Sequence, residues 1–360
     1  MKSTCTPKTV GLILAFVVVI SGIAGAAQNG STMQIDLPKY IAAYVQNSSE
    51  VSTARESAED AQTQWKRAVD EKKALLTIEE LKNAAETKRL ALQETLNNVA
   101  LKAVQAYVGL GQAERDLEAR QVSLSVATER LRVAKLRYEA GLTTKDSVLE
   151  QENSYLSATD SLVKAQKSVK QSKQDFCENA GMALVDKIVL TTDVSSLFTG
   201  AGEHDGAAIL KAAGAASSTC FSAAAAEDLA RRKNEALQDP MIATKTEREA
   251  AEKTYKDAKS RLADAEKSLT SSVADALASL ESLVRSLDMQ TISAQLAAAN
   301  LEVAKIRFSH GEMLQYEMDN EISSANQASY KVIQAETDLF VQLMKIHALT
   351  GGDVASLAAK

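Results

Sequence analysis

The sequence repeats itself at a fixed offset, and this repeat constrains the fold more than any other feature. The segment 131–141 (LRVAKLRYEAG) matches the segment 301–311 (LEVAKIRFSHG), which lies 170 residues further along the chain. The same register holds to the end of each half, where Gly181 matches Gly351. A chain with such a repeat uses one structural unit twice.

Each half carries a long heptad pattern. Apolar residues recur at every seventh position over 96–138, and the pattern returns over 273–308. A sustained repeat of seven is typical of α-helices that pack in a left-handed supercoil. The composition agrees, because 15 Gly, 3 Pro and 4% aromatic residues are too few for the turns and strands of an all-β sandwich or barrel.

A second apolar seam follows a glycine in each half. Seams of period seven run over 148–176 and 318–346, and they come shortly after Gly141 and Gly311. A glycine just past the end of a helix favours the left-handed conformation that closes it. The sequence therefore predicts an all-α fold of long antiparallel coiled-coil helical hairpins in two tandem repeats, with little or no β structure.

Local signals place the ends of these helices. Asp36 and Pro38 are typical of a helix start, and Thr77–Glu80 has the pattern of a capping box opening the long helix. Lys187–Thr192 is a short candidate strand. Two short helices placed end to end would match one long helix in each half. The predicted helices are 38–74, 78–140, 144–181, 207–238, 241–310 and 314–350.

The first residues have the pattern of a secretory signal. Lys2 and Lys8 precede an apolar stretch over 10–23, and Ala24-Gly25-Ala26 provides a cleavage motif. An uncleaved N-terminal anchor is the alternative. Cleavage would leave 39 basic and 47 acidic residues, and this acidic balance gives no support to nucleic-acid binding. The predicted organisation is a signal peptide (1–26), a first helical repeat (27–182), a linker (183–206) and a second helical repeat (207–360).

The sequence offers no catalytic or metal-binding motif. His204, His310 and His347 are far apart, and no nucleophile elbow, zinc motif or phosphate-binding loop occurs. We therefore expect no enzyme activity, no cofactor and no metal, and we interpret the loop 200–206 as a flexible connection. The two cysteines beyond the signal, Cys177 and Cys220, are either one disulfide or two free thiols.

The hairpin turns resemble a known family. Arg137-Tyr-x-x-Gly141 before Val148, repeated as Arg307-Phe-x-x-Gly311, resembles the hallmark of the TolC-like outer membrane efflux proteins. The resemblance implies a helical barrel trunk in which three chains form a hollow periplasmic tunnel. It implies docking of the glycine tips on a periplasmic adaptor and its inner-membrane pump, with 183–206 at the equator. It also implies an exported protein of the cell envelope, in the periplasm or at the outer membrane, that serves small-molecule or protein efflux.

One feature departs from that family. Its members join the short and long helices of each half by β-hairpins that cross the outer membrane. The corresponding connections here, 74–77 and 238–241, are too short for strands of about 9–11 residues. We therefore expect a shortened tunnel that meets another envelope component, or a purely periplasmic or extracellular assembly. The alternative is a structural or adaptor-like coiled-coil protein that bridges envelope layers without conducting.

Two sets of residues carry the expected site. Arg137, Gly141, Arg307 and Gly311 would form the adaptor-docking tip, although basic residues in a last helical turn also complement the helix dipole. Tyr138 and Phe308 continue the seam and are expected in the core. The resemblance places the pore aperture at Glu317, Asp319 and Asn320, while the alternative for Glu317 is stabilisation of the helix start by its charge.

Overall fold

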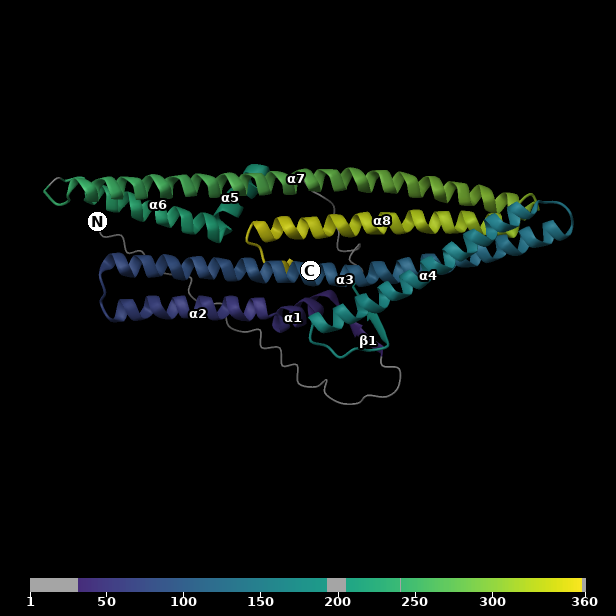
Figure 1. The fold of residues 1–360 in the computed structure, drawn as a ribbon, viewed down its shortest axis with the longest axis horizontal. Helices are drawn as coiled ribbons and strands as arrows, with labels where there is room; N and C mark the ends of the chain where they lie inside the picture. The colour runs from purple at the N-terminus through teal and green to yellow at the C-terminus, as the bar shows by residue number, and fades with distance from the viewer. Residues whose placement is uncertain (1–31, 193–204, 240, 358–360) are drawn as a thin grey trace, which may run out of the picture.

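Two helices of 65 residues each, α3 (Leu75–Glu139) and α7 (Lys245–Ser309), run along the long axis of the molecule (Figure 1). At 1.5 Å per residue each is about 98 Å long. The computed structural model describes residues 32–192, 205–239 and 241–357. The predicted signal peptide and His204 lie outside the described residues.

Each long helix is covered by shorter helices stacked end to end. Helices α2 (Ser49–Asp70) and α4 (Lys145–Asn179) pack along α3, and α6 (Ser218–Ala236) and α8 (Gln315–Leu349) pack along α7 (Figure 1). The hairpins α3–α4 and α7–α8 have identical helix lengths, 65 and 35 residues. The predicted all-α fold of repeated helical hairpins is confirmed.

The upstream helices are broken where the sequence predicted continuous ones. The segment 38–74 forms α1 (Leu37–Asn47) and α2, because Ser48 adopts an extended conformation and its side chain accepts the Val51 N–H. The segment 207–238 is broken in the same way at Ser217, between α5 (Gly206–Ala216) and α6. Serine is a strong N-cap, so a new helix starts at each break.

The start of α3 also differs from the prediction. The helix begins at Leu75, and its N-cap Ala74 has no side-chain hydrogen bond, so the expected capping box at Thr77–Glu80 is wrong. The box occurs instead at the start of α7, where the Thr244 hydroxyl accepts the Glu247 N–H and the Glu247 carboxylate accepts the Thr244 N–H. Asp36 caps α1 as predicted, accepting the Lys39 N–H at 2.9 Å.

Two four-residue strands form the only sheet in the described part of the chain. β2 (Lys187–Leu190) is the strand that the sequence indicated, and it pairs in parallel with β1 (Thr32–Ile35), which was not expected. Thr32 lies opposite Lys187, and Ile35 lies opposite Leu190. The sheet therefore ties the start of the described chain to the segment that follows the first hairpin.

The main hydrophobic core lies beside this sheet. Tyr40 of α1 stacks on Phe176 of α4, with ring centroids 3.8 Å apart, and Tyr107 of α3 packs beside both. The Tyr107 hydroxyl donates to the Ile35 carbonyl at 3.2 Å and accepts the Thr192 N–H at 3.0 Å. Burial raises the pKa of Tyr40 well above its usual value, so this ring stays neutral.

The cysteines do not form a disulfide. Cys177 lies in the core at the end of α4, and Cys220 lies in the first turn of α6. Both are buried free thiols, the second of the two alternatives that the sequence allowed. Burial raises the pKa of the Cys177 thiol, which disfavours its reactive thiolate form.

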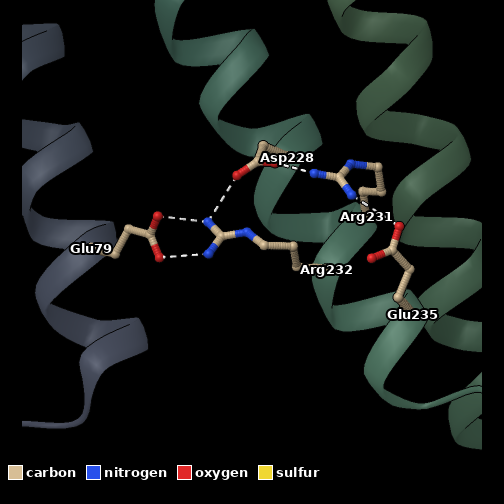
Figure 2. Close-up of polar contacts among 5 residues, drawn as sticks. All are labelled: Glu79, Asp228, Arg231, Arg232 and Glu235. Atoms are coloured by element: carbon tan, nitrogen blue, oxygen red, sulfur yellow. Dashed lines mark hydrogen bonds and ion pairs between the residues drawn. The ribbon is translucent and has the colours of Figure 1, made fainter. Parts of the chain in front are cut away.

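An ion-pair network joins the two halves at the end of the molecule opposite the glycine turns. Arg232 of α6 binds the Glu79 carboxylate of α3 with two hydrogen bonds, at 2.9 and 2.7 Å, and also pairs with Asp228 (Figure 2). Arg231 pairs with Asp228 and Glu235 within α6. The hydrogen bonds from Arg232 lower the pKa of Glu79, so the pair stays charged at neutral pH.

Candidate functional site

The two glycine turns have the same geometry. Gly141 and Gly311 have φ angles of 73° and 71°, in the left-handed region. In the first turn the Leu142 N–H donates to the Arg137 carbonyl at 2.8 Å, and in the second the Glu312 N–H donates to the Arg307 carbonyl at 2.9 Å. These are the hydrogen bonds of a Schellman cap. A Cβ on either glycine would meet no atom within 4 Å, so the backbone angle rather than space requires glycine.

Replacing Gly141 with Val is therefore expected to destabilise the first hairpin by about 1–2 kcal/mol, because a β-branched residue is strained at positive φ. Gly311→Val should have an equal effect in the second hairpin. Thermal unfolding followed by circular dichroism measures both effects. Gly109→Ala is the control and should not destabilise the protein, because Gly109 lies inside α3 and an added Cβ would meet no atom within 4 Å. Wild-type stability in both valine variants would contradict this account of the turns.

The two tips lie next to each other. A shallow hollow of about 230 Å³ is lined by Arg130, Arg137 and Thr143 of the first hairpin and by Tyr316 of the second. Arg137 and Arg307 occupy the last turns of α3 and α7 and are exposed. Neither guanidinium has an ion pair within the described residues, so both are free to meet an external carboxylate.

The start of α8 holds the three residues predicted for the aperture. The Glu317 carboxylate accepts the Leu314 N–H at 2.9 Å, so it caps the helix. Asp319 accepts a hydrogen bond from the Gln315 amide at 2.9 Å, and Asn320 is half-buried. The single chain thus shows the capping role of Glu317, and the aperture stays a prediction about an assembly.

An apolar face of α7 lies uncovered. Five large aliphatic side chains recur at spacings of three, four and seven residues on the side of α7 opposite its seam with α8, and all are exposed. This spacing aligns side chains along one helix face. We call this set the open face of α7: Met289, Ile292, Leu296, Val303 and Ile306.

The matching face of α3 is covered around Val126, whereas Val122 and Leu136, the counterparts of Ile292 and Ile306, are 38% and 50% exposed. Val126 is the counterpart of Leu296 in the repeat, and it is 9% exposed where Leu296 is 63% exposed. Both long helices pack in the same way against their hairpin partners, but α3 also packs against α8 of the other repeat. The extra contact with α8 therefore accounts for the burial of Val126. α7 lacks the corresponding neighbour, which would be a copy of α4.

The helix α4 also has apolar side chains that no other helix of the described chain covers. Leu149, Leu156 and Val163 recur at every seventh position along it, and each is more than half exposed.

The prediction that Tyr138 and Phe308 lie in the core is wrong for the single chain, in which they are 46% and 38% exposed. Both residues lie in the last turn of a long helix, directly before the glycine turn, and no other part of the described chain buries their rings.

The open face of α7 was not identified from the sequence. A signal for it exists, because its residues form a second apolar set of heptad spacing beside the seam that begins at Val273. Sequence patterning shows that such a face is apolar, but only the structure shows that no helix of the same chain covers it.

Other kinds of site find no support in the described residues. No three His, Cys, Asp or Glu side chains gather there as a metal site would require. The loop 200–206 lies mostly outside the described part. None of the described helices is both long and apolar enough to cross a bilayer.

Comparisons with known proteins point to one fold. No protein-family model and no curated protein matches the sequence. Among solved structures, the outer-membrane channel OprN aligns with a TM-score of 0.67 and 12% identity over 89% of this chain and 90% of that chain. CusC, described in terms of transmembrane channel formation, aligns with a TM-score of 0.65 and 12% identity over 91% and 95%. The outer membrane channel CmeC of Campylobacter jejuni aligns with a TM-score of 0.59 and 12% identity over 88% and 86%.

These likenesses show what class of fold the chain has. It folds like the outer-membrane channel proteins of the TolC-like type, as the tip motif indicated. The likeness extends over about nine-tenths of the chain, so it includes both repeats.

Proposed function

We propose that this protein is an efflux or export component that assembles as a homotrimer around an α-helical tunnel. In this proposal residues 1–26 direct export to the cell envelope, and 183–206 link the repeats 27–182 and 207–360. The observation that carries the proposal is the open face of α7, on which Leu296 is exposed while its counterpart Val126 is buried on α3, the long helix that packs against α8. The fold likeness to outer-membrane channels supports the same role.

The repeat supplies the geometry of assembly. If α7 of one copy packs on α4 of the next as α3 packs on α8, every helix of the two hairpins gains two neighbours. The contact is head-to-tail, so it generates a ring when the rotation closes. Three copies contribute two hairpins each. Around the ring, the contact of α3 with α8 within a chain then alternates with the equivalent contact of α7 with α4 between chains. A closed ring of long helices encloses a tunnel that small molecules or an unfolded protein can pass.

Loss of transport is the test of this function. Cells that lack the gene should retain a fluorescent efflux dye, and the wild-type gene should restore its extrusion. The double variant Ile292→Asp with Leu296→Asp should fail to restore extrusion, because it cannot form the ring. Normal extrusion in the deletion strain, together with a loss of envelope cohesion, would favour the non-conducting structural role instead.

The adaptor is proposed to dock at the glycine tips. Arg137 and Arg307 are exposed and have no ion pair within the described chain, so a carboxylate on an adaptor hairpin can bind them. Arg137→Glu with Arg307→Glu should leave the helical content unchanged and reduce cross-linking to the adaptor at least ten-fold. Unchanged cross-linking would show that the two arginines act only on the helix dipoles.

The aperture is proposed at Glu317, with Asp319 and Asn320 beside it. Three copies would place a ring of carboxylates around the axis, which favours cations and binds multivalent ones. Glu317→Gln keeps an oxygen that can accept the Leu314 N–H, so the helix cap survives while the charge is lost. The variant should lose most of the block of conductance by multivalent cations, and Glu312→Gln in the adjacent turn is the control. Equal block in the wild type and Glu317→Gln would place Glu317 away from the aperture.

A further inference from the structure

The end of the molecule opposite the glycine tips carries a second exposed surface. The connection between α2 and α3 and the connection between α6 and α7 both lie at this end (Figure 1). Glu79 binds Arg232 and Glu80 binds Lys233, so the start of α3 is fixed beside the end of α6 (Figure 2). The two connections therefore lie at the same end of the molecule, and we call their described residues the turn end (65–76, 237–239 and 241–245).

Aliphatic side chains project from the turn end into solvent. Met241 and Leu75 are 94% and 85% exposed, more than any other large apolar side chain in the described part of the chain. Ile242 and Leu76 lie next to them in sequence and are also exposed. Each connection thus presents a pair of neighbouring exposed apolar side chains at the same end of the molecule, and exposed apolar residues that cluster on a surface mark a contact with a membrane or a partner.

The connection between α2 and α3 is positive in a chain that is negative overall, whereas the connection that holds Met241 has one acidic residue, Asp239, and one basic residue, Lys245. The segment 65–76 contains four basic and two acidic residues, whereas the whole chain has a formal charge of −6. The basic residues are Lys66 and Arg67 near the end of α2 and Lys72 and Lys73 in the connection that follows, where Lys73 also pairs with Glu71 at 3.1 Å. Where cationic and exposed aliphatic residues lie close together, the aliphatic side chains can enter the acyl boundary of an anionic bilayer while the cationic ones bind its headgroups.

The backbone conformation of Lys72 supports the same interpretation. Lys72 has a φ of 52°, and it is the one residue other than glycine with a left-handed φ in the described chain. Its turn has the same hydrogen bonds as the glycine turns, with Lys72 N–H on the Val69 carbonyl and Lys73 N–H on the Ala68 carbonyl. Glycine would adopt this conformation without strain. A lysine held there at a cost to stability indicates a function for its charge.

We propose that the turn end binds the surface of a membrane that contains anionic lipid, with Leu75, Leu76, Met241 and Ile242 entering the acyl boundary and the lysines meeting the headgroups. The attachment is peripheral, and it orients the long axis of the protein across the periplasm with the glycine tips pointing away. This membrane attachment does not depend on the proposed tunnel, because either a single chain or an assembly can bind in this way.

Flotation with lipid vesicles tests the proposal. The purified wild-type protein should float with vesicles of phosphatidylglycerol and phosphatidylcholine, less with pure phosphatidylcholine, and less at high salt. Leu75→Ser with Met241→Ser should lower the partition coefficient about ten-fold or more. Intact mass must show the same N-terminus in all proteins, so that the apolar segment 10–23 contributes equally to each.

Lys72→Gly separates a role in binding from a role in the fold. The substitution relieves the strained backbone, so the melting temperature should rise by about 1–2 °C while binding to anionic vesicles falls about five-fold. A purely structural lysine would give higher stability with unchanged binding. The matched control is Leu142→Ser with Leu314→Ser, which removes two exposed leucines from the glycine tips and should leave flotation unchanged.

Two outcomes would overturn the proposal. The first is that two variants, the double variant Leu75→Ser with Met241→Ser and the single variant Lys72→Gly, both float to the same extent as the wild-type protein. The other is loss of flotation in the control variant, which would transfer membrane binding to the glycine tips. The mass of the assembly, measured on the same samples, reports on the tunnel separately, so failure of either idea leaves the other open to its own test.

Discussion

Ile292→Asp with Leu296→Asp is expected to convert the assembled protein into a folded monomer. Both side chains are exposed in the single chain, so the variant should keep its helical content and its melting behaviour as a monomer. In the ring the two carboxylates would be buried against α4 of the next copy without a partner, which costs several kcal/mol per ion. Sedimentation velocity at micromolar concentration measures the change in mass.

The matched control for this variant is Ser293→Asp. Ser293 is exposed on the same helix but does not belong to the open face of α7, so the substitution adds a charge without entering the proposed contact. It should leave the assembly intact. If the double variant keeps the mass of the wild type, the open face of α7 does not join the copies.

Phe176→Ala is expected to destabilise the protein by about 3–5 kcal/mol, the largest effect on stability that we predict for a single substitution. The ring is 1% exposed and stacks on Tyr40, and its removal leaves a cavity among α1, α3 and α4. The Tyr40 hydroxyl also donates to the Phe176 carbonyl at 3.2 Å, so loss of the stack disturbs this bond. Urea unfolding followed by circular dichroism measures the change.

Phe308→Ala is the control for the size of the side chain. Phe308 lies at the second tip and is 38% exposed, so its truncation should cost about 1 kcal/mol or less. Similar losses in the two variants would mean that the aromatic cluster beside the sheet is not the main core.

Much of the fold could be predicted because the sequence is periodic and repeated. The heptad seams fix which helices pair, and glycine at positions 141 and 311 fixes where the chain reverses, since a left-handed turn suits no other residue as well. The strand at Lys187–Leu190 was visible as a run of β-branched and aliphatic residues. The start of the first helix was predicted correctly, because Asp36 is a strong N-cap signal in the sequence.

The rest depends on contacts that a local pattern does not contain. The break at Ser48 was missed because serine is tolerated inside a helix as well as at its start, and tertiary packing decides between the two. β1 was missed because four residues carry little signal without their partner strand. The open face of α7 and the matching face of α3 have the same apolar spacing, so the burial of Val126 and the exposure of its counterpart Leu296 follow from the packing of α8 on α3 and not from the sequence pattern.

The residues of the candidate site were also predicted only in part. The tip glycines and arginines were found from a motif whose spacing is short and local. The exposure of Tyr138 and Phe308 was missed, because a seam position indicates an apolar face but does not show that a neighbouring helix covers it. The lysine at position 72 gives no signal at all in the sequence, since its left-handed backbone is set by the end of α2.

End-on images of the purified assembly by electron microscopy test the central claim most directly. Each copy brings α3, α4, α7 and α8 to the tip half of the molecule. The account predicts a hollow ring of three equivalent copies, with the wall built from these four helices of each copy and an empty centre. Single rods, or a solid bundle with no central channel, would contradict it.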